Sequence, residues 1–352
     1  MIKINVSNSR SYDILIEKGC INNTAEYLRT LSLGKKIMIT SDDTVAALYL
    51  DLLKSKLENA GYECYTFVFL HGESQKNAST YLSLIDALAE CHFSRKDAIL
   101  ALGGGVVGDL AGFAAATYMR GIRYISVPTT LLSMVDSSVG GKTAVDIAAG
   151  KNLLGAFWQP SLVIIDPDLL STLPEEYFSD GMAEVIKYAM IRDENIFALI
   201  ENGGAKDNIE ELIASCVKAK RDVVCEDEFE GGVRAILNFG HTPAHAIEKE
   251  SKYKISHGRA VAMGMKIMTK ASYLRGKCSI SSLEKLNAAL KEYSLDDECP
   301  YSAKQLAKRA LSDKKASGDS ILLIYTEGEG KALIEKTPLC EIEKIFGEGL
   351  GK

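Results

Sequence analysis

Three of the five histidines in this 352-residue chain lie close together, at His241, His245 and His257. Neutral imidazole is the commonest protein ligand for zinc and similar transition metals, and it also transfers protons near neutral pH. Any one of these histidines, taken alone, is better interpreted as a helix-start residue hydrogen-bonded to nearby backbone. Three of them so close together favour a metal or catalytic site.

The residues around the histidines predict where two helices begin. Thr242 is a favourable N-cap and Pro243 suits the first helical position, so a helix should start between His241 and His245. His257 stands at the mouth of the next apolar segment. Two histidines at the entrances of successive helices can converge on one point.

A glutamate earlier in the chain is a candidate third ligand. Glu184, Lys187 and Tyr188 fall at i, i+3 and i+4 on one face of a predicted helix over 182–190. The rest of that helix is strongly apolar, so we expect the charged pair to point into a cleft; the alternative is an ion pair on the helix surface. One glutamate and two histidines would form a three-ligand catalytic zinc set with an open position.

A glycine-rich turn follows a predicted strand and opens a predicted helix. Gly103, Gly105 and Gly108 satisfy the G-x-G-x-x-G pattern, which lets backbone approach a pyrophosphate at a helix N-terminus. Two features depart from the dinucleotide fingerprint: the turn follows the third or fourth strand, and the strand over 124–127 does not end in an acidic residue. A dinucleotide site and a plain tight turn remain equal alternatives on this motif alone.

Residues 137–143 end like a phosphate loop, but Asp136 stands where the first glycine is required. A loop that presents Lys142 to an anion is therefore favoured over a nucleotide triphosphatase. Thr129 and Thr130, just past a strand end, are either hydroxyl donors to a cofactor or plain turn residues.

Composition sets wider limits. The length suggests about two domains, and the net charge of −6, without any basic run, argues against a general nucleic-acid binder. Eight cysteines without a C-x-x-C pair indicate a reducing compartment. The N-terminus resembles a first strand and not a leader, and no apolar run approaches the roughly 20 residues of a membrane span, so we expect a cytoplasmic protein.

Short apolar runs alternate with helix-periodic segments up to about residue 170, which indicates an α/β domain with a Rossmann-like open sheet and ligands at its carboxyl edge. The predicted strands are 1–6, 36–40, 64–69, 98–102, 124–128 and 162–166, and the predicted helices are 45–60, 79–91 and 110–118.

Helical periodicity dominates after Pro174, so we place a domain boundary near 171–175 and predict an all-α second domain with one small hairpin. The predicted helices are 173–200, 210–225, 244–250, 260–275, 281–292 and 304–311, and the hairpin pairs 320–325 with 331–334. A site built from both halves would occupy the cleft between them.

Taken together, these motifs resemble the 3-dehydroquinate synthase family of the sugar-phosphate cyclase superfamily. The resemblance runs in the family's order from about residue 70 to 265. It is carried by the blocks 102–112, 118–122, 128–143, 150–152, 157–160, 181–188, 237–242, 245–248 and 257–258.

The resemblance implies an NAD-binding α/β domain over 1–172, a helical metal- and substrate-binding domain over 173–352, and a homodimer. It implies a lyase of the shikimate pathway, which leads to chorismate and the aromatic amino acids. That enzyme converts 3-deoxy-D-arabino-heptulosonate 7-phosphate to 3-dehydroquinate and phosphate with the help of NAD and Zn²⁺ or Co²⁺.

Residue roles follow from the same resemblance. The implied metal ligands are Glu184, His241 and His257. The implied cofactor contacts are Glu73, Lys76, Gly104, Gly105, Val106, Asp109, Thr129, Thr130, Lys142, Lys151 and Thr172. The implied catalytic and substrate-binding residues are Asp136, Lys142, Asn152, Lys187, Lys220, Arg234, Asn238, His245, Lys314 or its neighbour Lys315, and Arg120 from a partner subunit.

Three alternatives stay open. The first is another sugar-phosphate cyclase, of the 2-deoxy-scyllo-inosose or valiolone type, although Lys220 and Arg234 favour a substrate with a carboxylate. The second is a metal-dependent polyol dehydrogenase, which would accumulate NADH. The third is a non-catalytic nucleotide-binding module, which would bind NAD without a metal.

Overall fold

The computed structural model describes residues 1–312 and 318–351. Contacts divide the chain into two compact units, Met1–Pro174 and Glu175–Lys352. Among the described helices, none combines the length and the apolar character needed to cross a bilayer.

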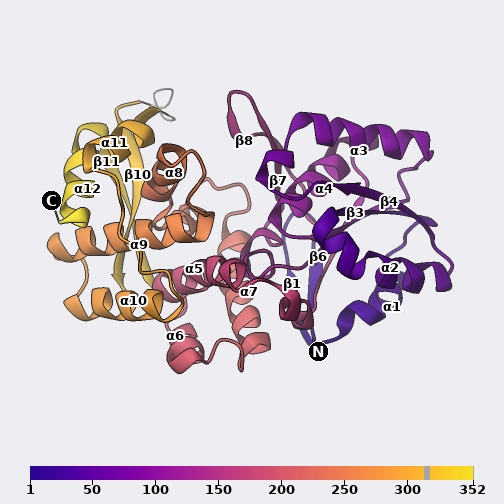
Figure 1. The fold of residues 1–352 in the computed structure, drawn as a ribbon, viewed down its shortest axis with the longest axis horizontal. Coiled ribbons are helices and arrows are strands. Elements are labelled where there is room, and N and C mark those ends of the chain that lie inside the picture. The colour runs from indigo at the N-terminus through magenta and orange to yellow at the C-terminus, as the bar shows by residue number, and fades with distance from the viewer. Residues whose placement is uncertain (313–317, 352) are drawn as a thin grey trace. The chain divides into compact units, whose positions relative to one another are not determined.

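The first unit is built on a seven-stranded sheet (Figure 1). Its first two strands pair antiparallel and all other neighbours pair parallel. In spatial order the strands are β1 (Ile2–Val6), β2 (Tyr12–Ile16), β9 (Leu162–Ile165), β6 (Arg123–Pro128), β5 (Ala98–Gly103), β3 (Lys36–Asp42) and β4 (Glu63–Phe69). All six predicted strands are confirmed. β2, which lies between the antiparallel edge strand β1 and the parallel strand β9, was not predicted.

Burial along the strands follows their place in the sheet. Every residue of β5 and β9 is buried, as expected of strands covered on both faces. β4 lies at the sheet's edge and is partly exposed, which shows that an apolar run does not by itself mean a strand covered on both faces.

The helices of the first unit are α1 (Thr24–Arg29), α2 (Asp43–Asn59), α3 (Ala78–Glu90) and α4 (Gly105–Thr117). Side chains cap two of them: Asp42 accepts from the Val45 N–H at 2.9 Å, and Asn77 accepts from the Thr80 N–H at 3.0 Å. α4 begins five residues before its predicted start, because the helix incorporates most of the glycine turn.

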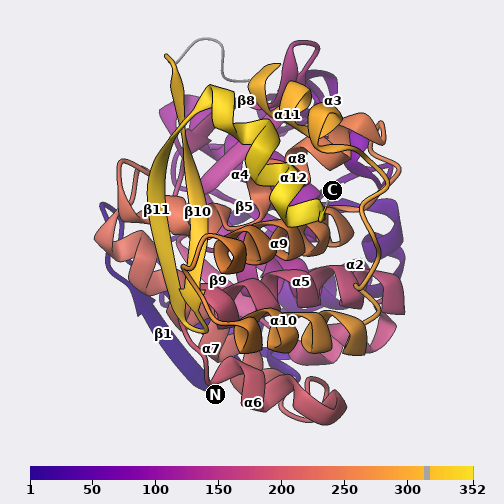
Figure 2. The same cartoon turned by 90° about the vertical axis from the view of Figure 1, so that its left-hand side faces the viewer.

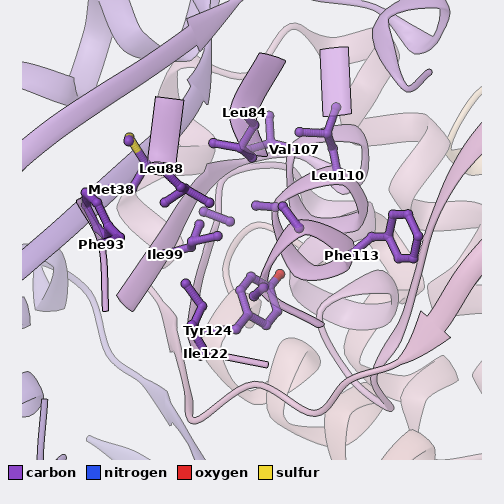
Figure 3. Packing of buried hydrophobic residues seen from close by; sticks show 14 of the residues in the cluster. Met38, Leu84, Leu88, Phe93, Ile99, Val107, Leu110, Phe113, Ile122 and Tyr124 are labelled. Atoms are coloured by element: carbon purple, nitrogen blue, oxygen red, sulfur yellow. The ribbon is translucent and has the colours of Figure 1, made fainter. Parts of the chain in front are cut away.

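The core between α3, α4 and the sheet is apolar throughout (Figure 3). Leu84 and Leu88 of α3 pack with Val107 and Leu110 of α4 against Ile99 of β5. All five side chains are almost completely buried. Their packing holds α4, and the glycine turn at its start, in place against the sheet.

A second, antiparallel pair in the first unit was not predicted. β7 (Lys142–Ile147) pairs with β8 (Gly150–Phe157). Lys142 therefore begins a strand, and the expectation of a loop around it is wrong. The side chain of Lys142 is nevertheless exposed.

The cap of α2 offers a test of how this unit is stabilised. Asp42→Ala should lower the free energy of unfolding by about 1 kcal/mol, because it leaves a helix N-terminal N–H without its side-chain acceptor. Urea unfolding followed by circular dichroism measures the change. Asp51→Ala, at an exposed position inside the same helix, is the control and should stay within about 0.5 kcal/mol of the unchanged chain. Equal stability of the two variants would contradict the role of the cap.

The second unit is helical with one hairpin (Figure 2). α9 lies at its centre and contacts α5, α8, α10, α12 and β10. The helices are α5 (Glu175–Ile191), α6 (Ile196–Ile200), α7 (Ile209–Glu226), α8 (His241–Glu250), α9 (His257–Leu274), α10 (Ile280–Glu292), α11 (Ala303–Ser312) and α12 (Ile342–Leu350). The predicted hairpin is confirmed as β10 (Ser320–Gly328) with β11 (Lys331–Pro338). The helix predicted over 173–200 is in fact two helices, α5 and α6.

Candidate active site

A buried ion pair lies on α5. Glu184 is fully buried, Lys187 is 1% exposed, and the two side chains form a salt bridge one turn apart. Tyr188 is buried on the same face. The alternative of a solvated surface ion pair is therefore excluded. Since charged side chains are rarely buried without a partner or a ligand, this face of α5 marks a specialised site.

The two histidines predicted to converge do so. α8 begins at His241 and α9 begins at His257, and their ring centroids are 5.6 Å apart. The predicted N-cap is wrong, however. Gly240 takes the cap position in the left-handed region, with φ of 76°, and Pro243 falls later in the first turn, where no intrahelical donor is needed.

A close helix crossing explains why glycine stands at this cap. A Cβ atom on Gly240 would lie 2.8 Å from the backbone nitrogen of Met265 in α9, and one on Gly264 would lie 2.0 Å from the carbonyl oxygen of Gly240. The two helix backbones touch here, next to His241. This contact sets where the first histidine stands relative to the second.

Glu184, His241 and His257 form a compact set of potential metal ligands. The Nε2 atoms of the two histidines lie 3.4 and 3.3 Å from Oε1 of Glu184, and one ligand atom from each residue falls within 4.8 Å of the others. Ligand atoms held about 2.1 Å from a tetrahedral zinc ion are about 3.4 Å from one another, so these separations suit such an ion. His245, one turn further along α8, is outside the set, with its ring centroid 5.6 Å from that of His241.

The electrostatics of this set favour an ionised carboxylate. Burial alone would raise the pKa of Glu184, but the charges of Lys187 and His241 hold that pKa well below its usual value. Burial also opposes protonation of His257, and hydrogen bonds with Glu184 and Glu248 outweigh it and raise the pKa of His257 to about 10. The site therefore holds an ionised carboxylate that stabilises positive charge beside it, whether on a protonated imidazole or on a metal cation.

Two further cations are buried in the second unit. Lys220 on α7 is 7% exposed, and Arg234, in the 3₁₀ turn Val233–Asn238, is 2% exposed. That turn packs against both α5 and α7. The Arg234 guanidinium donates to the carbonyl of Glu228, and the amide of Asn238 donates to Oε1 of Glu230 at 3.0 Å. Lys187, Lys220, Arg234 and Asn238, four of the predicted substrate contacts, thus come from elements that pack together.

Several predicted residues of the first unit meet at Lys76. Its ammonium group is buried and lies 3.1 Å from Oδ2 of Asp109, 2.7 Å from Oδ1 of Asn152 and 3.6 Å from Oε1 of Glu73. Lys151 reaches the same Glu73 oxygen at 3.0 Å. Four predicted cofactor contacts and one predicted substrate contact are thereby brought together.

Packing accounts for part of the glycine turn. A Cβ atom on Gly103 would lie 2.5 Å from Val107, and one on Gly104 would lie 3.1 Å from Thr130. The Thr129 N–H donates to the carbonyl of Gly103 at 3.1 Å. The Thr129 hydroxyl is buried and, among the described residues, has no hydrogen-bond partner, so it is available to donate to a ligand.

The other predicted residues are more scattered. Gly105 and Val106 lie in the first turn of α4, and Asp136 lies in the π-helical turn Ser133–Ser137. Asp109 and Lys142 line one small hollow. Thr172 contacts the hydroxyl of Tyr49, and Arg120 is exposed with φ of 67°; neither belongs to the Lys76 cluster in the described chain. The predicted Lys314 and its neighbour Lys315 lie outside the described residues.

Two glutamates at the site were given no role by the sequence. Glu248 lies 3.4 Å from Nδ1 of His257, and Glu230 accepts from Asn238. Glu248 falls one turn after His245, inside a block that carries the resemblance. This position could have indicated that Glu248 has a role at the site. No sequence feature indicated a role for Glu230, because its contact with Asn238 depends on the left-handed backbone at Glu230, with φ of 63°.

Comparison with solved structures defines the class of protein. The chain superposes over 99% of its length on a 2-deoxy-scyllo-inosose synthase complexed with carbaglucose-6-phosphate, NAD⁺ and Co²⁺, with a TM-score of 0.89 and 25% identity. It covers 97% of a 2-epi-5-epi-valiolone synthase from Streptomyces hygroscopicus subsp. jinggangensis, with NAD⁺ and Zn²⁺ bound, with a TM-score of 0.87 and 26% identity. An iron-containing alcohol dehydrogenase shares the fold alone, at 14% identity and a TM-score of 0.65. The fold is that of the sugar-phosphate cyclases.

Sequence comparison narrows the class to a family. The family models for the N-terminal and C-terminal regions of 3-dehydroquinate synthase match residues 66–180 and 181–316. A 3-dehydroquinate synthase of Clostridium kluyveri is 43% identical over 97% of this chain and 96% of its own length. One of Streptococcus sanguinis is 41% identical over 98% of this chain and 99% of its own length. The chain belongs to the 3-dehydroquinate synthase family.

Proposed function

We propose that this protein is a 3-dehydroquinate synthase, a carbon–oxygen lyase that converts 3-deoxy-D-arabino-heptulosonate 7-phosphate to 3-dehydroquinate and phosphate. The observation that carries the proposal is the convergence of Glu184, His241 and His257 in a chain 43% identical to a named relative over nearly its whole length. The buried cations Lys220 and Arg234 support a substrate with two anionic groups.

The same proposal assigns roles to the two parts of the chain. Residues 1–172 would bind NAD through the Lys76 cluster and the glycine turn, and residues 173–352 would bind the metal and most of the substrate. NAD⁺ with Co²⁺ or Zn²⁺ in the two solved cyclases supports this assignment. The buried Thr129 hydroxyl and the 3.3 and 3.4 Å ligand separations are the matching features of this chain.

When bound, NAD⁺ would accept a hydride from the ring carbon that bears the oxidised hydroxyl, whose proton is lost in the same step, and would later return that hydride; the metal would supply a Lewis acid to the oxygen. Glu184 contributes the negative charge that holds such a cation, and the two imidazoles contribute neutral nitrogen donors. Lys187, Lys220 and Arg234 would fix the carboxylate and phosphate of the substrate. Phosphate elimination, ring opening and aldol closure then require mainly that the substrate is held in the right geometry.

A second candidate is a cyclase that makes 2-deoxy-scyllo-inosose or a valiolone. The high structural similarity to both of those enzymes favours it. Their identity of 25 and 26% is well below the 43% shared with the 3-dehydroquinate synthase of Clostridium kluyveri. Burial of Arg234 also favours a carboxylate-bearing substrate, since bidentate pairing with carboxylate is the characteristic use of a guanidinium group.

We further propose that the protein is a cytoplasmic homodimer and that Arg120 reaches the partner's site. Its exposure on the surface of the first unit supports a contact with another copy.

The decisive experiment supplies the heptulosonate phosphate, NAD⁺ and Co²⁺ or Zn²⁺ to the purified protein. We expect stoichiometric phosphate release and a carbocyclic product, without net NADH formation. A chelator should stop the reaction and added metal should restore it. Steady NADH accumulation would instead indicate a dehydrogenase, and turnover of glucose 6-phosphate in preference to the heptulosonate would indicate the second candidate.

A further inference from the structure

The two ring nitrogens of His257 face two different carboxylates. Nε2 lies 3.3 Å from Oε1 of Glu184, within the metal-ligand set, and Nδ1 lies 3.4 Å from Oε1 of Glu248. A neutral imidazole carries its proton on one nitrogen only, so an acceptor at Nδ1 leaves the Nε2 lone pair free for a metal. Glu248 is therefore placed to favour the tautomer of His257 that carries its proton on Nδ1.

The other candidate histidine has a different outer partner. Nδ1 of His241 lies 3.0 Å from the backbone carbonyl of Phe239, while its Nε2 also faces Glu184. A carbonyl is neutral and a carboxylate is anionic. Glu248 therefore makes Nε2 of His257 a stronger metal ligand than Nε2 of His241. The two imidazoles are therefore unequal, although they share one ligand set.

Local structure fixes Glu248 in this position. It lies in the last turns of α8 and is 8% exposed. Its carbonyl accepts from the Ser251 hydroxyl at 2.8 Å and from the Tyr253 N–H at 2.7 Å. Tyr253 has φ of 60°, so the chain turns sharply here and returns His257 to the helix that carries Glu248. The carboxylate and the imidazole thus meet through the turn between α8 and α9.

We propose that Glu248 is a positioning residue of the metal centre: it accepts the Nδ1 proton of His257, fixes the ring and strengthens Nε2 as a metal ligand. The inference rests on the metal site of the proposed function and extends it to a residue outside the ligand set. It requires no contact between Glu248 and the substrate.

The test compares Glu248→Ala and Glu248→Gln with the unchanged chain. Co²⁺ affinity is measured by competition with a chelating dye, and the visible absorption spectrum of the bound Co²⁺ reports the geometry of its ligands. We expect Glu248→Ala to bind Co²⁺ about 10- to 100-fold more weakly, as is typical when an outer partner of a metal-bound histidine is lost. Glu248→Gln keeps an oxygen acceptor without the charge. Its Co²⁺ affinity should lie between those of the unchanged chain and Glu248→Ala, and its absorption spectrum should be shifted.

The matched control is Glu250→Gln, two residues along the same helix, where the carboxylate pairs with Arg309 at the surface. Its Co²⁺ affinity and spectrum should equal those of the unchanged chain. Unaltered affinity and spectrum in Glu248→Gln would overturn the inference even if Glu248→Ala does not fold. Failure of the unchanged chain to bind Co²⁺ would overturn the proposed metal site as well, so the two failures are distinguishable.

Discussion

Replacing His257 with alanine is expected to abolish metal binding and to lower turnover by about a thousandfold or more. A metal acting as a Lewis acid contributes several kcal/mol to transition-state stabilisation, and each 1.36 kcal/mol corresponds to a factor of ten in rate. His257 supplies one of only three protein groups in the set, and its side chain is one-third exposed, so its removal disturbs little of the core.

Elemental analysis, NAD⁺ titration and thermal unfolding measure the outcome of this substitution. Metal content should fall to background, whereas NAD⁺ affinity and the unfolding temperature should stay near those of the unchanged chain. His71→Ala is the control. That histidine is exposed, and its ring pairs with the carboxylate of Asp43, which is not a member of the metal-ligand set. An active variant with a full complement of metal would refute the assignment of His257 as a ligand.

Glu184→Gln is a less specific test of the same centre. Glu184 and Lys187 form a fully buried ion pair. Removing one charge from such a pair leaves the other uncompensated and commonly costs about 3–5 kcal/mol. Loss of activity in this variant would therefore mix unfolding with loss of a ligand, which is why His257 is the better position.

The second large effect is expected at the crossing of α8 and α9. Gly264→Ala should lower the free energy of unfolding by about 2 kcal/mol and weaken Co²⁺ binding, because the new methyl group would lie 2.0 Å from the carbonyl oxygen of Gly240. Overpacking typically costs about 1–3 kcal/mol, and contact with backbone is not relieved by a change of rotamer. The higher helix propensity of alanine offsets only about 1 kcal/mol.

Urea unfolding and Co²⁺ titration together test this expectation. Gly231→Ala is the matched control, since the nearest atom to its methyl group would be Oδ1 of Asp227 at 3.9 Å. That variant should keep the stability of the unchanged chain. If Gly264→Ala were equally stable and bound Co²⁺ normally, the close crossing would have no role in setting the distance between His241 and His257.

The sequence predicted the sheet and the metal-ligand set well because their signals are local or chemical. Buried parallel strands such as β5 and β9 are uninterrupted apolar runs, and a histidine cluster is conspicuous in a chain with few histidines. The pair β7–β8 was missed since β8 is largely exposed and carries no apolar alternation. The single helix predicted over 173–200 failed because a helical period continues across the break between α5 and α6.

Tertiary contacts decided what the sequence left open at the site. The start of α8 was misplaced because Gly240 owes its conformation to α9, which local capping preferences do not include. The roles of Glu230 and Glu248 depend on turns that return the chain to Asn238 and His257. Lys76 was named as a cofactor contact through the family resemblance alone, and its contact with Asn152 was not foreseen.

All three members of the metal-ligand set belong to the unit Glu175–Lys352, where α9 packs against both α5 and α8. The ligand geometry is consequently built by the packing of a single unit. Substitutions that loosen the contacts of α9 should therefore disturb metal binding even when they lie far from the three ligand atoms.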